Sequence, residues 1–158
     1  MRRAPLVAAA ALLLLSACRI PARLYPVSGP FAASVPVPVV EVRLTVNLNN
    51  TSGRIALQLP DGENCQGTWT WTDHREVTGG NTASNALTRP DMPAVWDQVF
   101  GPQTYSSRIL GIISERADLS GDRGTALHLE WEGRQGVGKD NKGNIYKLIF
   151  TGSQYGIR

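Results

Sequence analysis

Two cysteines and two histidines are the side chains in this sequence whose types suit covalent or acid–base chemistry. Cys18 differs from the others by its position, because it directly follows an apolar run over residues 6–15 and two small residues. A basic start at Arg2 and Arg3, a short apolar core and small residues before a cut site are typical of a secretory signal. The run is shorter than the about 20 apolar residues that a membrane-spanning helix needs. We therefore expect residues 1–17 to act as an export signal.

The stretch Leu15-Ser16-Ala17-Cys18 resembles the lipobox of bacterial lipoproteins. The resemblance implies diacylglyceryl transfer to the Cys18 thiol, cleavage between Ala17 and Cys18, and N-acylation of the new terminus. One acyl chain holds a protein only marginally on a membrane and two hold it stably, so three chains predict a permanent anchor. By the same resemblance, Arg19 after the cysteine favours the outer membrane, facing the periplasm, over the inner membrane. The alternative is an ordinary signal peptide cut near Ala17, which leaves Cys18 as a free thiol.

Composition limits the partners of the mature chain. Loss of residues 1–17 removes two arginines and lowers the formal net charge from +3 to +1 over the remaining 141 residues, a length that suits one domain. No long run of lysine and arginine remains, so we expect no nucleic-acid partner. If Cys18 carries lipid, Cys65 has no disulfide partner in the same chain, and it is either buried and inert or available to a partner protein.

The histidines suggest a hydrolase or a metal site only weakly. A hydrolase would combine His74 or His128 with a serine and an aspartate, such as Ser114 or Ser120 with Asp118 or Asp122. The sequence contains no Gly-x-Ser-x-Gly nucleophile motif. A metal site formed by Asp73, His74 and His128 has no recognised ligand spacing. We therefore expect no catalytic residue, no metal and no cofactor.

Two glycine-rich stretches near the C-terminus have ordinary structural explanations. The segment 133–140 is similar to a phosphate-binding loop, but its lysine is followed by Asp140 in place of serine or threonine, and no helix signal follows. The segment 140–144 carries oxygen ligands that suit calcium but lacks the spacing of an EF-hand. We expect a glycine-rich loop over 133–143, with a plain turn between two strands.

Alternating apolar residues predict most of the folded part. A period of two begins at Val40, and turn-forming residues separate the alternating segments. The predicted strands cover 40–48, 54–59, 65–72, 105–114, 125–132 and 144–151, with a weak strand or a turn of helix over 95–100 and a turn over 119–124. Such short strands without strong helical segments predict an all-β fold, a small antiparallel barrel or sandwich of about six to seven strands.

Two segments lack this alternation. Residues 19–38 hold half of the prolines, and we expect an extended tether between the lipidated cysteine and a single β domain over 39–158. The alternative is that residues 35–39 already form an edge strand, where proline is tolerated. Residues 73–92 are polar and fit a long loop, which is often functional when it occurs in a compact domain.

The tryptophans of the third strand offer a further candidate surface. Trp69 and Trp71 share one face of the segment 65–72, while threonines occupy the other face. We expect the tryptophan face to lie in the core; if it is exposed instead, the rings would suit stacking on a sugar or an aromatic ligand.

The segments Leu59-Pro60-Asp61-Gly62-Glu63-x-Cys65-x-Gly67-x-Trp69 and Gly136-x-Gly138-x-x-x-x-Gly143-x-x-Tyr146-x-Leu148-x-Phe150 together resemble small β-rich lipoproteins of Gram-negative bacteria. In those proteins a second cysteine often lies near the late glycines, where this chain has Lys139. The resemblance implies no catalytic activity. We therefore expect a lipid-anchored envelope protein with a binding or structural role. The alternatives are an inhibitor or assembly factor that captures a protein partner through 73–92, or a hydrolase.

Overall fold

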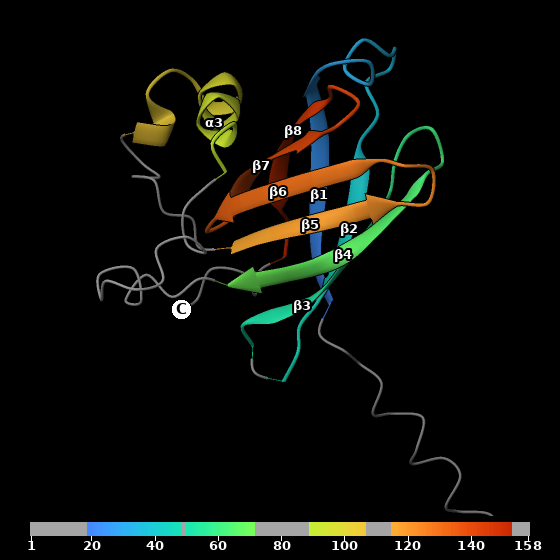
Figure 1. Ribbon diagram of the computed structural model, residues 1–158, viewed down its shortest axis with the longest axis vertical. Coiled ribbons are helices and arrows are strands. Elements are labelled where there is room, and N and C mark those ends of the chain that lie inside the picture. Colours follow the sequence, from blue (N-terminus) through green and yellow to red (C-terminus); the bar gives the residue numbers. More distant parts are fainter. Residues whose placement is uncertain (1–18, 49, 72–88, 107–114, 153–158) are drawn as a thin grey trace, which may run out of the picture.

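The described residues form a closed barrel of eight antiparallel strands, with a helix packed against its outside (Figure 1). In this computed structural model, the described residues are 19–48, 50–71, 89–106 and 115–152. The strands are β1 (Arg19–Ser28), β2 (Val40–Thr45), β3 (Ser52–Gln58), β4 (Asn64–Trp71), β5 (Glu115–Gly121), β6 (Ala126–Glu132), β7 (Gln135–Asp140) and β8 (Ile145–Phe150). Each strand pairs with the next along the chain, and β8 pairs with β1 to close the sheet. The predicted all-β barrel is therefore confirmed, with eight strands in place of six or seven.

Alternation of side chains along each strand fills the barrel interior. In β2 the residues Val40, Val42 and Leu44 are buried, while the residues between them are more exposed. The same period of two runs through β3 and β8. Inward side chains of every strand except β7 form one apolar core, and an eight-stranded barrel is just wide enough for side chains to fill it.

Three aromatic rings form a cluster within this core. The ring centroid of Trp131 lies 6.2 Å from that of Trp69 and 5.6 Å from that of Phe150, both in tilted arrangements. The inward glycine at position 136 makes room for this cluster, because a Cβ atom added there would lie 2.5 Å from the Cβ of Trp131. Tilted pairs at such distances stabilise a core beyond the area they bury.

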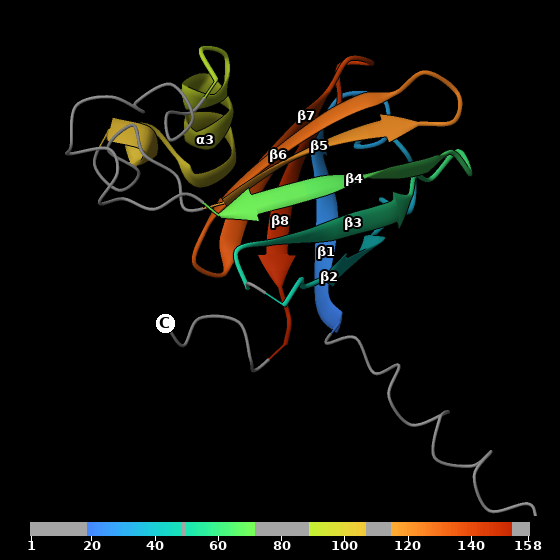
Figure 2. The same ribbon diagram turned by 60° about the horizontal axis from the view of Figure 1, so that its bottom comes forward.

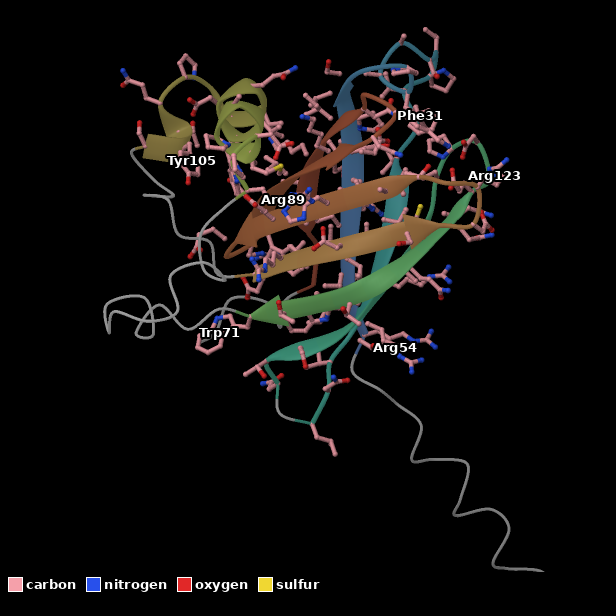
Figure 3. All side chains as sticks on the ribbon, in the orientation of Figure 1. Phe31, Arg54, Trp71, Arg89, Tyr105 and Arg123 are labelled. Carbon is pink, nitrogen blue, oxygen red and sulfur yellow. The ribbon has the colours of Figure 1, made fainter. Side chains whose placement is uncertain are left out.

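The two ends of the barrel differ. We call the edge at which β1 begins the N-terminal end; Arg19 pairs there with Thr45, so the β2–β3 loop lies at the same end. We call the opposite edge the far end, where the 29–39 loop and the turns after β3, β5 and β7 meet. Figure 3 labels Arg54 toward the first end and Phe31 and Arg123 at the second.

Helix α3 (Met92–Phe100) connects β4 to β5 and lies on one flank of the barrel, against β7 and β8 (Figure 2). A proline in its first turn suits the start of a helix, where backbone N–H groups lack acceptors. Met92, Val95 and Trp96 are buried against the outward Val137 of β7. Among the described residues, no helix is long and apolar enough to cross a membrane.

Within the segment 18–38, expected to hold the lipidated cysteine and a tether, the tether was wrong over residues 19–28, because these form β1 in the wall of the barrel. Ala22 and Leu24 point into the core and so follow the period of two. The prolines between and beside them indicated a tether instead of a strand. Pro21 lies outside the β8 register and its carbonyl oxygen accepts a hydrogen bond from the Thr151 N–H at 3.1 Å, while Pro26 lies at a register shift. The missing N–H groups are therefore tolerated, and the β domain begins before residue 39.

Other sequence expectations need smaller corrections. The expected glycine-rich loop over 133–143 is mostly strand β7, and the expected turn over 119–124 begins as the end of β5. The segment 95–100, left open between strand and helix, belongs to α3. Residues 35–39 are not a strand. The strand expected over 105–114 and the loop expected over 73–92 fall largely outside the described residues.

Candidate functional site

The tryptophan face of β4 belongs to the core. Trp69 is buried and its indole N–H donates to the Thr45 carbonyl oxygen at 2.9 Å, which ties β4 to the end of β2. Trp71 is partly buried and packs against the same core. Trp69 therefore presents no open face for stacking on a sugar, whereas Trp71 keeps part of its surface exposed.

Arginines gather on the outer surface near the N-terminal end. Arg19, Arg43 and Arg54 are exposed residues of β1, β2 and β3. The strand register makes them diagonal neighbours, because Arg43 lies opposite Pro21 on one side and opposite Ala56 on the other. Together they line a groove of about 530 Å³ with Thr45, Gln66 and Thr68. We call Arg19, Arg43 and Arg54 the arginine face.

The arginine face carries little compensating negative charge. Within the described part of the chain, no ion pair involves Arg19, Arg43 or Arg54. The nearby acidic side chain on the outside of β2 is Glu41, which lies opposite Arg23 of β1 in the register. The groove is thus an anion-attracting surface with hydroxyl and amide groups at its edge.

A fully exposed leucine lies at the same end. Leu48 follows β2 in the loop that leads to β3, and its side chain is completely exposed to solvent. Single exposed apolar residues are common on protein surfaces. Its significance here comes from its position, since it stands on the end of the barrel at which residue 18 precedes β1.

His128 lies on the outside of β6 between two carboxylates. Its Nδ1 atom is 2.7 Å from Asp118 Oδ1, and its Nε2 atom is 3.0 Å from Glu130 Oε1. Each ring nitrogen therefore lies within hydrogen-bonding distance of a carboxylate oxygen. Both nitrogens are thus occupied by carboxylates, and neither is placed to activate Ser120.

Glu130 connects this histidine to the helix. Its side chain is fully buried, and it accepts hydrogen bonds from the Trp96 indole N–H at 3.2 Å and the Arg89 backbone N–H at 3.1 Å. The Arg89 guanidinium reaches Asp118 at 3.3 Å. A buried carboxylate requires such partners, and here they come from β6, α3 and the segment before α3. The hydrogen bonds of Glu130 therefore hold α3 and the segment before it against the barrel.

The far end is closed by a second buried carboxylate, Glu63. It accepts hydrogen bonds from the Lys142 ammonium at 2.7 Å, the Thr125 hydroxyl at 2.5 Å and the backbone N–H groups of Arg123 and Thr125 at 2.9 Å each. The Lys142 ammonium, followed by the Thr125 hydroxyl, lowers the pKa of this carboxyl to about 2. Glu63 thus ties together the turns after β3, β5 and β7.

Two more groups at the far end have structural roles. Asp140 accepts hydrogen bonds from the Lys142 N–H, from Asn144 and from the Tyr146 hydroxyl, so its oxygens stabilise the β7–β8 turn. The expected plain turn is confirmed. Cys65 is buried nearby, and burial, with a smaller contribution from the Glu63 charge, raises the pKa of its thiol to about 11. The sequence left Cys65 either buried and inert or available to a partner protein, and this buried environment fits the inert state.

Exposed valines mark the far end as well. Val35 is 96% exposed, and Val37 and Val39 are about half exposed in the loop between β1 and β2. Val39 also borders a groove of about 890 Å³ over β2 to β5, whose other lining residues include Glu41, Gln58 and Asn64. This groove extends toward the arginine face, because Arg43, Ala56 and Gln66 line both grooves.

The remaining candidates lie outside the described residues or lack the expected geometry. Cys18, Asp73, His74 and Ser114 are not among the described residues. Within the described ranges, no group of three or more histidine, cysteine or acidic side chains is arranged to hold a metal ion. The arginine face and the buried Glu130 were not identified from the sequence, because both depend on strand register and on the position of α3.

No protein-family model, curated protein or solved structure matches this chain.

Proposed function

We propose that this chain is a lipid-anchored protein of the bacterial cell envelope with a binding or structural role. Acyl chains on Cys18 hold it in the outer membrane, with the barrel facing the periplasm. The observation that carries the proposal is the lipobox-like Leu15-Ser16-Ala17-Cys18 immediately before the first barrel residue, Arg19. A filled core and a histidine with both nitrogens hydrogen-bonded favour a role at the outer surface over catalysis.

Intact mass after extraction from membranes tests this proposal. The expected product is a chain that begins at Cys18 and carries three acyl chains. The variant Cys18→Ser is expected to lack the acyl mass and to leave the membrane fraction. Cys65→Ala is the matched control, because it also removes one thiol but one that is buried in the barrel. An unlipidated mature chain cut near Ala17 would contradict the proposal.

A second candidate function is the capture of a protein partner. The specific observation is the apolar loop at the far end, where Val35, Val37 and Val39 are exposed beside the 890 Å³ groove. An anchor at Cys18 holds this loop away from the bilayer, toward other envelope proteins. A photo-crosslinking residue at Val37 is expected to give one protein adduct in intact cells, while the same residue at the exposed Gln135 gives none. Equal adducts from both positions would argue against this candidate.

The hydrolase alternative has no supporting observation among the described residues. The two ring nitrogens of His128 contact the carboxylates of Asp118 and Glu130 and not a serine. A role for His74 stays a prediction from sequence, because that residue is outside the described ranges.

A further inference from the structure

We propose that the N-terminal end of the barrel docks directly on an anionic phospholipid surface through the arginine face and Leu48. The inference deepens the proposed function, on which its orientation rests, by naming the surface that the anchored barrel contacts. It depends on three observations: the place where β1 begins, the charge of Arg19, Arg43 and Arg54, and the exposure of Leu48.

The first observation is that no tether separates residue 18 from the barrel, because β1 begins at Arg19. Consecutive Cα atoms are about 3.8 Å apart, so a lipidated residue 18 lies next to the start of β1. With no spacer, acyl chains that enter the bilayer bring Arg19 to the level of the lipid headgroups. The β2–β3 loop comes with it, because Arg19 pairs with Thr45 at the end of β2.

The second observation is charge complementarity. Arg19, Arg43 and Arg54 line one groove and have no ion-pair partner within the described residues. Guanidinium groups match the geometry of phosphate oxygens and form paired hydrogen bonds with them. Thr45 and Thr68, at the edge of the same groove, add hydroxyl donors. Phospholipid headgroups supply the anionic oxygens that such a surface lacks.

The third observation concerns the apolar tip. Leu48 is fully exposed although the chain buries its other leucines among the described residues. A leucine beside cationic side chains is the combination by which peripheral proteins enter the headgroup boundary. The exposed valines at 35, 37 and 39 lie on the far end, where the groove beside Val39 has one arginine, Arg43, among its lining residues. The chemistry of the two ends therefore favours the end nearest Cys18.

Vesicle binding by the unlipidated mature chain isolates this surface from the anchor. Residues 18–158 with Cys18→Ser keep all eight strands and α3 and lack the basic leader. Binding is measured by co-sedimentation with vesicles of phosphatidylglycerol and phosphatidylcholine, and with phosphatidylcholine alone. We expect binding to the anionic vesicles only, and we expect it to weaken as salt is raised because surface charges are screened.

Matched double variants test the arginine face. The double variant Arg43→Gln with Arg54→Gln is expected to weaken vesicle binding about 25-fold. Each basic residue at an anionic surface contributes about a fivefold change in affinity, and the two contributions multiply. The control is Arg123→Gln with Lys139→Gln, which removes the same charge from exposed residues elsewhere on the barrel and should change binding less than threefold. Leu48→Ser should weaken binding with no change in charge. Near-ultraviolet circular dichroism establishes that each variant keeps the native fold.

Three results would overturn the inference: equal binding to both vesicle types, equal losses for the two double variants, or full competition by inorganic phosphate at constant ionic strength. The last result would assign the groove to a soluble anion. None of these results bears on the acyl mass of the native protein, so this inference and the lipid anchor fail separately.

Discussion

Replacing His128 with leucine should destabilise the barrel, because it removes a hydrogen-bond partner from the buried Glu130. The Glu130 side chain is 0% exposed, and its Oε1 atom lies 3.0 Å from His128 Nε2. Loss of one partner of a buried polar group costs about 1–3 kcal/mol. With a urea slope of about 2 kcal/mol per molar, the unfolding midpoint of the mature chain should fall by about 1 M.

The control substitution is made at Asp118, the other carboxylate that contacts His128. Asp118 is closer to the ring, at 2.7 Å against 3.0 Å for Glu130, but its side chain is 73% exposed. Solvent screens exposed pairs, so Asp118→Asn should cost only about 0.2–1 kcal/mol. The double variant His128→Leu with Glu130→Leu should cost less than the sum of the two single changes, since it leaves no buried charge. Equal losses for His128→Leu and Asp118→Asn would refute this reasoning.

Two further predictions concern the far end. Glu63 has a pKa of about 2 in the folded chain against an ordinary value of 4.5, so its stabilising contribution is full above about pH 4.5 and is lost as the pH falls toward 2. Urea midpoints of Glu63→Gln should therefore change less between pH 4.5 and 2.5 than those of the parent chain, and parallel curves would contradict this. Cys65 is buried with a pKa raised to about 11, so in the Cys18→Ser chain it should resist a disulfide reagent at pH 8 until urea unfolds the barrel. Rapid reaction of the native chain would show that this thiol is accessible.

The alternating strands were predictable because each carries its own pattern. Segments around β2, β3, β6 and β8 alternate apolar and polar residues, and that period needs no knowledge of the partner strand. Strand β7 escaped prediction because Gly136 and Gly138 replace the inward apolar residues, where the Trp131 and Leu129 side chains need the space. Strand β1 escaped because its prolines indicate an extended tether, although Ala22 and Leu24 point into the core.

The candidate surfaces were less predictable than the strands. Arg19, Arg43 and Arg54 are far apart in sequence, and only the register of β1, β2 and β3 makes them neighbours. The alternation of β6 predicts His128 and Glu130 as outward, exposed residues, but both are buried, and Trp96 of α3 donates a hydrogen bond to Glu130. Long-range burial of this kind depends on helix packing, which a period of two cannot indicate.

Crosslinking from the lipid side tests the central claim most directly. Phospholipids with a photoactivatable headgroup, incorporated into vesicles that hold the native acylated protein, label the residues that face the membrane. We predict lipid adducts on peptides that contain Arg19, Leu48 and Arg54, and none on the loop over 29–39. Adducts on the 29–39 loop, or an even distribution over both ends, would contradict docking through the N-terminal end of the barrel.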